Sequence, residues 1–348
     1  MNQFESILLF CLKKLNNERT IYSIFHLLNG KKSSQTIQDA HLFSLKKFFG
    51  IYDTLTRESF ENKIEIMLEK QWINSSGENR FILTPNGELY LNNNQLPQYL
   101  NGWTYHLFTP LFWERLSLLI QVASNFVYQE TKYSPIQKSK DVHIWLKSLL
   151  IEIQVPRQSI GKKIYSELIE CFNEANDIDP SVIIFRLTGF QQIGLTSSQT
   201  AKKLKMDIHD YEIEFVNILH YLFNTISSDT KQFPILSFLL DNLKQNNELT
   251  LSSRKTWNLF NQGYSPELIA DKRNLKMSTI EDHFVEFALH LDDFSIDDYV
   301  DRILQNKILE VSRQSATRQL KLIRDKVNSA NYFQIRLVLA KYGDRSWN

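Results

Sequence analysis

Residues 252–290 constrain the fold of this chain more than any other stretch, because their pattern is that of three short helices joined by tight turns. The first helix ends before Gly263, and glycine is the residue most typical of the turn after a helix. Ser265 and Pro266 favour the start of a second helix, and Ser278 favours the start of a third. This succession predicts a helix-turn-helix, and nothing of comparable strength in the sequence predicts an active site.

The composition favours a mostly α-helical protein with short connections. Ten glycines and eight prolines are few for 348 residues, and both residues interrupt helices. Lys and Arg number 40 against 39 Asp and Glu, a net charge of +1, so there is no overall attraction to nucleic acid. Cys11 and Cys171 stand apart, which predicts buried reduced thiols and neither a disulfide framework nor a zinc site.

The sequence contains no targeting segment that we recognise. Its first apolar residues recur at helical spacing, and charged residues flank them, which indicates an amphipathic helix. These residues are Phe4, Ile7, Leu8, Cys11, Leu12 and Leu15. No uncharged apolar run approaches the roughly 20 residues that a membrane span requires. We therefore expect no membrane partner and a cytoplasmic protein, with association with the nucleoid as an alternative.

Changes in pattern divide the chain into three predicted domains. Residues 1–95 resemble a winged helix, residues 96–245 form a helical middle domain, and residues 246–348 contain the helix-turn-helix. The polar run 244–248 is the expected hinge before the last domain. A second, weaker helix-turn-helix candidate lies at 182–223, where a simple three-helix packing unit is an equal alternative.

The winged-helix prediction rests on a change in the spacing of apolar residues, from helical to strand-like. Expected helices over 42–49 and 56–70 are followed by two short apolar runs around the turn 75–79, which predicts a β-hairpin. The segment Leu83–Gly87 resembles the LTxxG sequence that is frequent after the wing of bacterial winged-helix proteins. Five cations here could contact a DNA backbone, although a solvated surface is their more usual role. They are Lys31, Lys32, Lys46, Lys47 and Arg80.

The middle domain is rich in aromatic residues. Trp103, Tyr105, Phe108, Phe112 and Trp113 could form a platform on which bases stack. Buried aromatic side chains more often belong to a core or a domain contact, and we favour that interpretation.

The C-terminal residues resemble a specific family. The segments 263–270, 273–275 and 278–283 closely resemble the helicase helix-turn-helix domain found near the C-terminus of some RecQ-type DNA helicases, and 296–300 and 332–340 fit the same module. The full layout also resembles stand-alone proteins of low-GC Gram-positive bacteria, whose genes lie beside a RecQ-type helicase without this domain. The resemblance implies a helicase accessory protein in DNA repair or recombination.

The charges of the third helix do not suit DNA. Glu281, Asp282 and Glu286 would face a phosphate-lined groove without any Lys or Arg on the same helix. The expected DNA contacts therefore come from the flanking turns and from the first helix, with Thr279 as a base contact. These candidates are Arg254, Lys255, Lys272, Arg273, Lys276 and Thr279.

The tail is basic and the segment before it is acidic. Residues 302–348 hold ten Lys and Arg against three acids, whereas 282–301 hold seven acids and no Lys or Arg. Arg318, Lys321 and Arg324 are expected to form a strip that follows a phosphate backbone. The alternative is that acidic and basic segments pair with each other within the domain.

Motifs of catalysis are missing from the sequence. Gly161-Lys162-Lys163 lacks the other residues of a phosphate-binding loop, and no metalloprotease, hydrolase or dinucleotide motif occurs. The acid pairs 292–293 and 297–298 are typical of helix starts. We expect no catalytic residue, metal or cofactor, and a non-enzymatic accessory protein that binds single-stranded, duplex or forked DNA. The alternatives are a protein-protein adaptor without DNA contact and a winged-helix transcription regulator.

Overall fold

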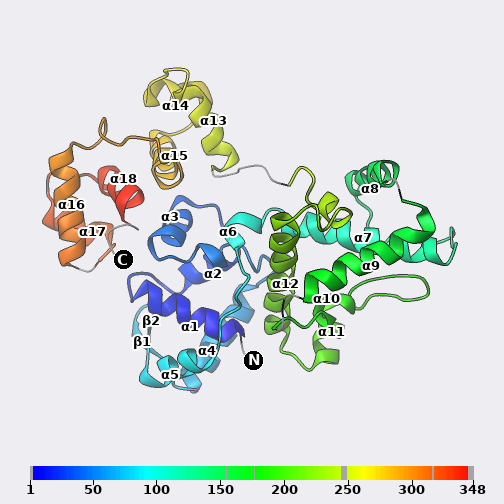
Figure 1. Ribbon diagram of the computed structural model, residues 1–348. Coiled ribbons are helices and arrows are strands. Elements are labelled where there is room, and N and C mark those ends of the chain that lie inside the picture. The colour runs from blue at the N-terminus through cyan, green and yellow to red at the C-terminus, as the bar shows by residue number, and fades with distance from the viewer. Residues whose placement is uncertain are drawn as a thin grey trace. The chain divides into compact units, whose positions relative to one another are not determined.

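The computed structural model describes residues 3–153, 155–173, 175, 177–243, 249–315 and 317–343 (Figure 1). The fold is mostly α-helical with one small sheet, as predicted. The expected hinge 244–248 lies outside the described residues. Cys11 and Cys171 are both buried free thiols.

Contacts divide the chain into two compact units that are interleaved in sequence. The first unit contains residues 1–7 and 93–245, and the second contains residues 8–92 and 246–348. The boundaries lie close to the two changes of pattern in the sequence. The second unit, however, groups the first and third predicted segments together, so both ends of the chain contribute to it. The three-domain division itself stays a prediction.

The segment before residue 94 consists of five helices, one 3-10 turn and a β-hairpin. They are α1 (Gln3–Leu15), α2 (Tyr22–Leu28), α3 (Ser34–Leu42), η1 (Lys46–Phe48), α4 (Arg57–Glu69), β1 (Ile73–Gly77), β2 (Arg80–Leu83) and α5 (Pro85–Asn93). The strands are antiparallel, with Ile73 opposite Leu83. The predicted wing is therefore present. The expected helix 42–49 is wrong, because Ser44 has a φ of +54° and only the turn η1 follows.

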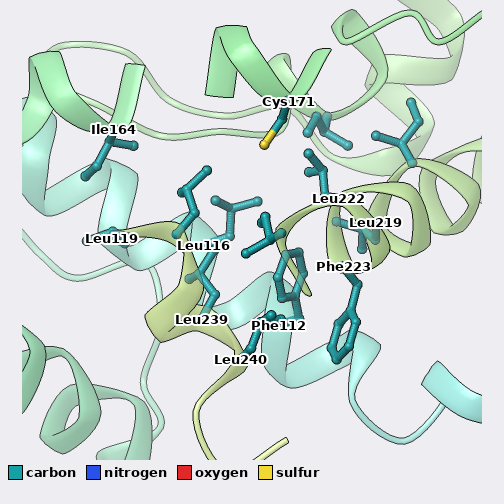
Figure 2. Close-up of a cluster of buried hydrophobic side chains, with 14 of the residues drawn as sticks. Phe112, Leu116, Leu119, Ile164, Cys171, Leu219, Leu222, Phe223, Leu239 and Leu240 are labelled. Atoms are coloured by element: carbon teal, nitrogen blue, oxygen red, sulfur yellow. The ribbon is translucent and has the colours of Figure 1, made fainter. Parts of the chain in front are cut away.

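The first unit contains seven helices and a 3-10 turn among its described residues after residue 93. They are α6 (Gly102–Tyr105), α7 (Thr109–Val127), α8 (Lys140–Glu152), α9 (Arg157–Asn173), α10 (Ser181–Ile184), α11 (Ser197–Leu204), α12 (Ile208–Ser228) and η2 (Leu236–Leu240). Figure 2 shows side chains of α7, α9, α12 and η2 meeting in its core.

The aromatic run of the middle domain belongs largely to that core. Phe112 is fully buried and Tyr105 nearly so, and the ring of Tyr105 lies 4.5 Å from that of Phe223 between centroids. Most of α12 is buried as well. This burial favours a packing unit over a DNA-reading helix at 182–223.

The C-terminal segment adds six helices to the second unit. They are α13 (Leu251–Phe260), α14 (Pro266–Arg273), α15 (Met277–His290), α16 (Arg302–Gln314), α17 (Leu320–Lys326) and α18 (Tyr332–Tyr342). Helix α15 packs against α18 and also against α3 from the other end of the chain. The winged-helix segment and the helix-turn-helix segment thus share one hydrophobic interior.

We predict that Gly30→Ala destabilises the second unit more than Gly263→Ala does. Both glycines have positive φ, +66° and +86°, which costs another residue about 1–2 kcal/mol. A Cβ on Gly30 would also lie 2.9 Å from the Cα of Gly50, whereas nothing lies within 4 Å of one on Gly263. Urea unfolding of both variants measures the difference. Equal losses of unfolding free energy would contradict the close approach of Gly30 to Gly50.

Candidate nucleic-acid interface

Capping side chains start two of the three helices of the helix-turn-helix, α13 and α14. The Thr250 hydroxyl accepts a hydrogen bond from the Ser253 amide at the start of α13, and the Ser265 hydroxyl accepts one from the Leu268 amide at the start of α14. Asn274 ends α14 in the left-handed conformation. Local sequence therefore accounts for the starts of α13 and α14. The prediction that Ser278 caps the third helix is wrong, because α15 begins at Met277 after Lys276, without a side-chain cap.

The second half of α15 lies in an aromatic core. Phe284 and Phe287 pack with Trp257, Phe260 and Phe294, with ring centroids between 5.0 and 6.1 Å apart. His283 is also buried, and its Nδ1 lies 2.8 Å from the Thr256 hydroxyl. The exposed residues of α15 are therefore those of its first turn, Met277 and Ser278, while Thr279, Glu281 and Asp282 are half-buried.

Two of the three carboxylates of α15 have partners inside the protein. Glu286 is buried and accepts hydrogen bonds from the Ser253 hydroxyl at 2.5 Å and from the Thr250 amide. Burial raises the pKa of Glu286. Asp282 pairs with Arg336, with 2.6 Å between Oδ1 and Nη2. Glu286 is thus withdrawn from any ligand and Asp282 is paired, but Asp282 and Glu281 both remain partly exposed.

Arg273 connects two helices. Its Nη1 donates to the Ser252 carbonyl at 2.8 Å and to the Thr256 hydroxyl, and its Nη2 donates to the Ser252 hydroxyl at 3.1 Å. Burial lowers the pKa of this guanidinium. The side chain predicted to contact DNA therefore holds the end of α14 against the first turn of α13.

The predicted cations Arg254, Lys255, Lys272 and Lys276 lie within three residues along the chain of Ser252 or Arg273, the two residues that this connection joins. Lys255, Lys272 and Lys276 are exposed, and Arg254 and Thr279 are half-buried. In the described chain no side chain caps the start of α15, so its first amides can face an anion. We call this group the basic surface, and it consists of Arg254, Lys255, Lys272, Lys276 and Thr279.

The predicted strip on the tail is divided by the fold. The Arg318 guanidinium lies 5.0 Å from the centroid of the Phe43 ring, and its amide donates to Glu18 Oε2 at 2.7 Å. Lys321 and Arg324 are exposed on α17. Arg318 thus serves packing between the two ends of the chain, and only the other two cations face solvent.

Pairing within the domain accounts for further basic residues of the tail. Arg302 lies 3.5 Å from Asp297, and the Lys341 amine donates to the carbonyls of Leu291 and Asp292. These contacts support the alternative that acidic and basic segments neutralise each other. Asp344 and Arg345, which the sequence analysis counts in the tail, lie outside the described residues.

The cations of the N-terminal segment differ in exposure. Lys31 and Lys32 are exposed. The Lys47 amine lies over the rings of Phe10 and Phe48, at 5.3 and 4.8 Å from their centroids, and burial lowers its pKa. Lys47 is therefore a packing residue first.

Arg80 of the wing and Lys321 of α17 are distant in sequence but line one pocket. Arg80 also donates to the Asn17 carbonyl at 2.7 Å, while Lys46 is half-buried and does not line this pocket. The pocket is polar, has a volume of about 660 Å³ and is also lined by Arg336. The sequence analysis missed that the wing and α17 meet here, because no local pattern relates them.

The helix that precedes the wing is acidic on its exposed side. Glu58, Glu65 and Glu69 are all exposed on α4. A winged helix that reads DNA usually places this helix in the groove, so the acids make DNA contact by α4 unfavourable.

Other kinds of site are not evident in the described residues. No group of three or more His, Cys, Asp and Glu side chains there could hold a metal ion. No helix of the described chain is both long and apolar enough to cross a membrane.

Comparison with known proteins agrees with the position of the motif. A helix-turn-helix domain family matches residues 252–339. The chain is 33% identical to Protein YpbB of Bacillus subtilis (strain 168) over 347 residues, which cover 98% of each protein. No solved structure matches the chain.

We predict that acid weakens the second unit partly through His283. Burial and the nearby Arg273 lower the pKa of His283 from 6.5 to about 4. Between these values the unfolded chain binds a proton that the folded chain does not, so the free energy of unfolding falls as the pH falls. One histidine accounts for about 1.2 kcal/mol between pH 7 and 5.5.

Urea unfolding of the wild type and His283→Gln at both pH values measures this effect. The variant should be less stable at pH 7 and lose about 1 kcal/mol less on acidification. The same pH dependence in both proteins would show that His283 does not titrate in this way.

Proposed function

Because the chain belongs to the same family as Protein YpbB of Bacillus subtilis and carries a helix-turn-helix domain, we propose that it binds DNA through the basic surface. The observation that carries this proposal is the exposure of Lys255, Lys272 and Lys276 close in sequence to the two helix ends that Arg273 joins. Lys and Arg contacts to phosphates supply most of the affinity in such complexes.

The exposed part of α15 limits what the motif can recognise. Ser278 is exposed and Thr279 half-buried, whereas Ile280 and the residues from His283 to Ala288 are buried. Few side chains can therefore reach base edges, which is how sequence is read in the major groove. We accordingly expect binding that depends on backbone geometry, with forked DNA preferred over a particular sequence.

We further propose that the protein is a non-enzymatic accessory of a RecQ-type helicase in DNA repair or recombination. Support comes from the resemblance of residues 263–283 to the helicase helix-turn-helix domain. On this proposal the protein supplies DNA contacts that the helicase lacks, and ATP hydrolysis belongs to the helicase.

We predict that Lys272→Glu/Lys276→Glu weakens DNA binding at least about tenfold near 0.1 M salt, because two phosphate contacts become repulsive. The slope of log affinity against log salt should decrease by about 2. Fluorescence anisotropy with single-stranded, duplex and forked DNA at several salt concentrations measures both quantities. Lys132→Glu/Lys147→Glu, which reverses two exposed charges of the first unit, is the matched control. Equal affinity of the two double variants would refute the basic surface.

The helicase role predicts a separate result. A RecQ-type helicase without this domain should unwind forked duplex faster when the wild-type protein is added, and less so with Lys272→Glu/Lys276→Glu. Unchanged unwinding with the wild type would remove the helicase role and leave DNA binding standing.

A protein-protein adaptor is the second candidate function. Two observations favour it: α15 is buried over most of its length, and α4 exposes the acids Glu58, Glu65 and Glu69. Absence of binding to all three DNA forms would decide for the adaptor. A complex with a polypeptide through an apolar interface would also be recognised by its weak dependence on salt, unlike a complex with DNA.

A further inference from the structure

The first unit contains a pocket that the DNA-binding proposal does not use. Its volume is about 480 Å³, within the usual range for sites of small organic ligands. The polar and aromatic residues that matter for its chemistry come from α7, the start of α11 and the loops before α8 and α11. They are Trp113, Ser117, Gln137, Arg186, Ser197 and Ser198.

Arg186 gives this pocket a positive charge that no carboxylate of the described residues neutralises. Its Nη1 donates to the Ser197 hydroxyl at 2.6 Å and lies 3.4 Å from the Tyr211 hydroxyl. Within the described residues no carboxylate pairs with the guanidinium. It lies over the rings of Phe215 and Trp113, at 5.0 and 5.8 Å from their centroids. The lining contains no carboxylate either. A cation in such a concave site attracts anions, and the planar guanidinium suits phosphate.

The remaining lining suits an aromatic ring with polar edges. Trp113 is half-buried, so part of its indole stays available to a ligand, and the Gln137 amide donates to the Ser117 hydroxyl at 2.8 Å on the same wall. Ser198 is exposed at the start of α11. Aromatic side chains bind bases by stacking, and amides and hydroxyls bind their edges.

We infer that this pocket binds a nucleoside phosphate, with the phosphate on Arg186 and the hydroxyls of Ser197 and Ser198, and the base against Trp113. The ligand is either a free mononucleotide or the 5′-phosphorylated end of a DNA strand. Both present the same phosphomonoester beside a base. The site involves none of the residues of the basic surface.

Isothermal titration calorimetry of the full chain tests the inference with adenosine 5′-monophosphate and adenosine. Short oligothymidylates with a 5′-phosphate or a 5′-hydroxyl test the second source, and here Lys272→Glu/Lys276→Glu serves as the parent so that the basic surface contributes little. We expect the phosphorylated member of at least one pair to bind about tenfold or more tightly than the other. If the phosphate is preferred only in the adenosine pair, the ligand is a free mononucleotide. If it is preferred only in the oligothymidylate pair, the ligand is the 5′-phosphorylated end of a strand.

Three variants locate the site. Arg186→Gln should remove the preference for phosphate. Ser198→Asp should remove it too, because it places a negative charge in the pocket. This variant should stay folded, since an acid stabilises the start of a helix such as α11. Lys202→Gln removes an exposed charge from α11 outside the pocket and should change nothing. Equal binding within both pairs, or a preference for phosphate that survives folded Ser198→Asp, would overturn the inference.

Discussion

The arrangement of the second unit depends on the guanidinium of Arg336, which connects three helices from opposite ends of the sequence. It pairs with Asp282 of α15 and donates hydrogen bonds to Ser34 and Gln38 of α3. The Arg336 side chain is 17% exposed and that of Asp282 40%, so solvent partly screens this ion pair and its loss costs less than that of a fully buried pair. Because Arg336 is largely buried here, α15 is held to α18 and α3 by charge as well as by apolar contact.

This attachment divides α15 into a second half that packs in the interior and a first turn that lies at the surface. The second half of α15 supplies Phe284, Phe287 and Glu286 to the interior, where Glu286 bonds to the start of α13. The first turn, with Lys276 and Ser278, remains at the surface. The net charge of α15 therefore overstates the negative charge that a ligand meets, since Glu286 is buried and Asp282 is paired with Arg336, while Glu281 is half-buried.

Local patterns were sufficient to predict most helices and their starts. Ser33 and Thr56 cap α3 and α4, and the hairpin follows α4 as the change of period predicts. The failure at 42–49 arises because Ser44 adopts a left-handed backbone conformation, which its apolar neighbours do not reveal.

The candidate site was harder to predict, because partners distant in sequence decide it. Exposure of Lys272 and Lys276 fits the predicted DNA contacts, whose function stays a prediction. Arg273 and Arg318 were also predicted to contact DNA. Arg273 instead donates a hydrogen bond to Ser252, and Arg318 packs on the ring of Phe43. Periodicity describes one helix at a time and contains no information about such pairs.

The interleaved second unit also has a consequence for synthesis on the ribosome. Residues 8–92 emerge first, but α15 and α18, which cover α3, are translated only after the whole first unit. At 5–20 residues per second that delay is on the order of tens of seconds. During this time the nascent winged-helix segment exposes the apolar surface of α3 that the folded second unit buries, so this unit completes its fold only after α18 has been translated.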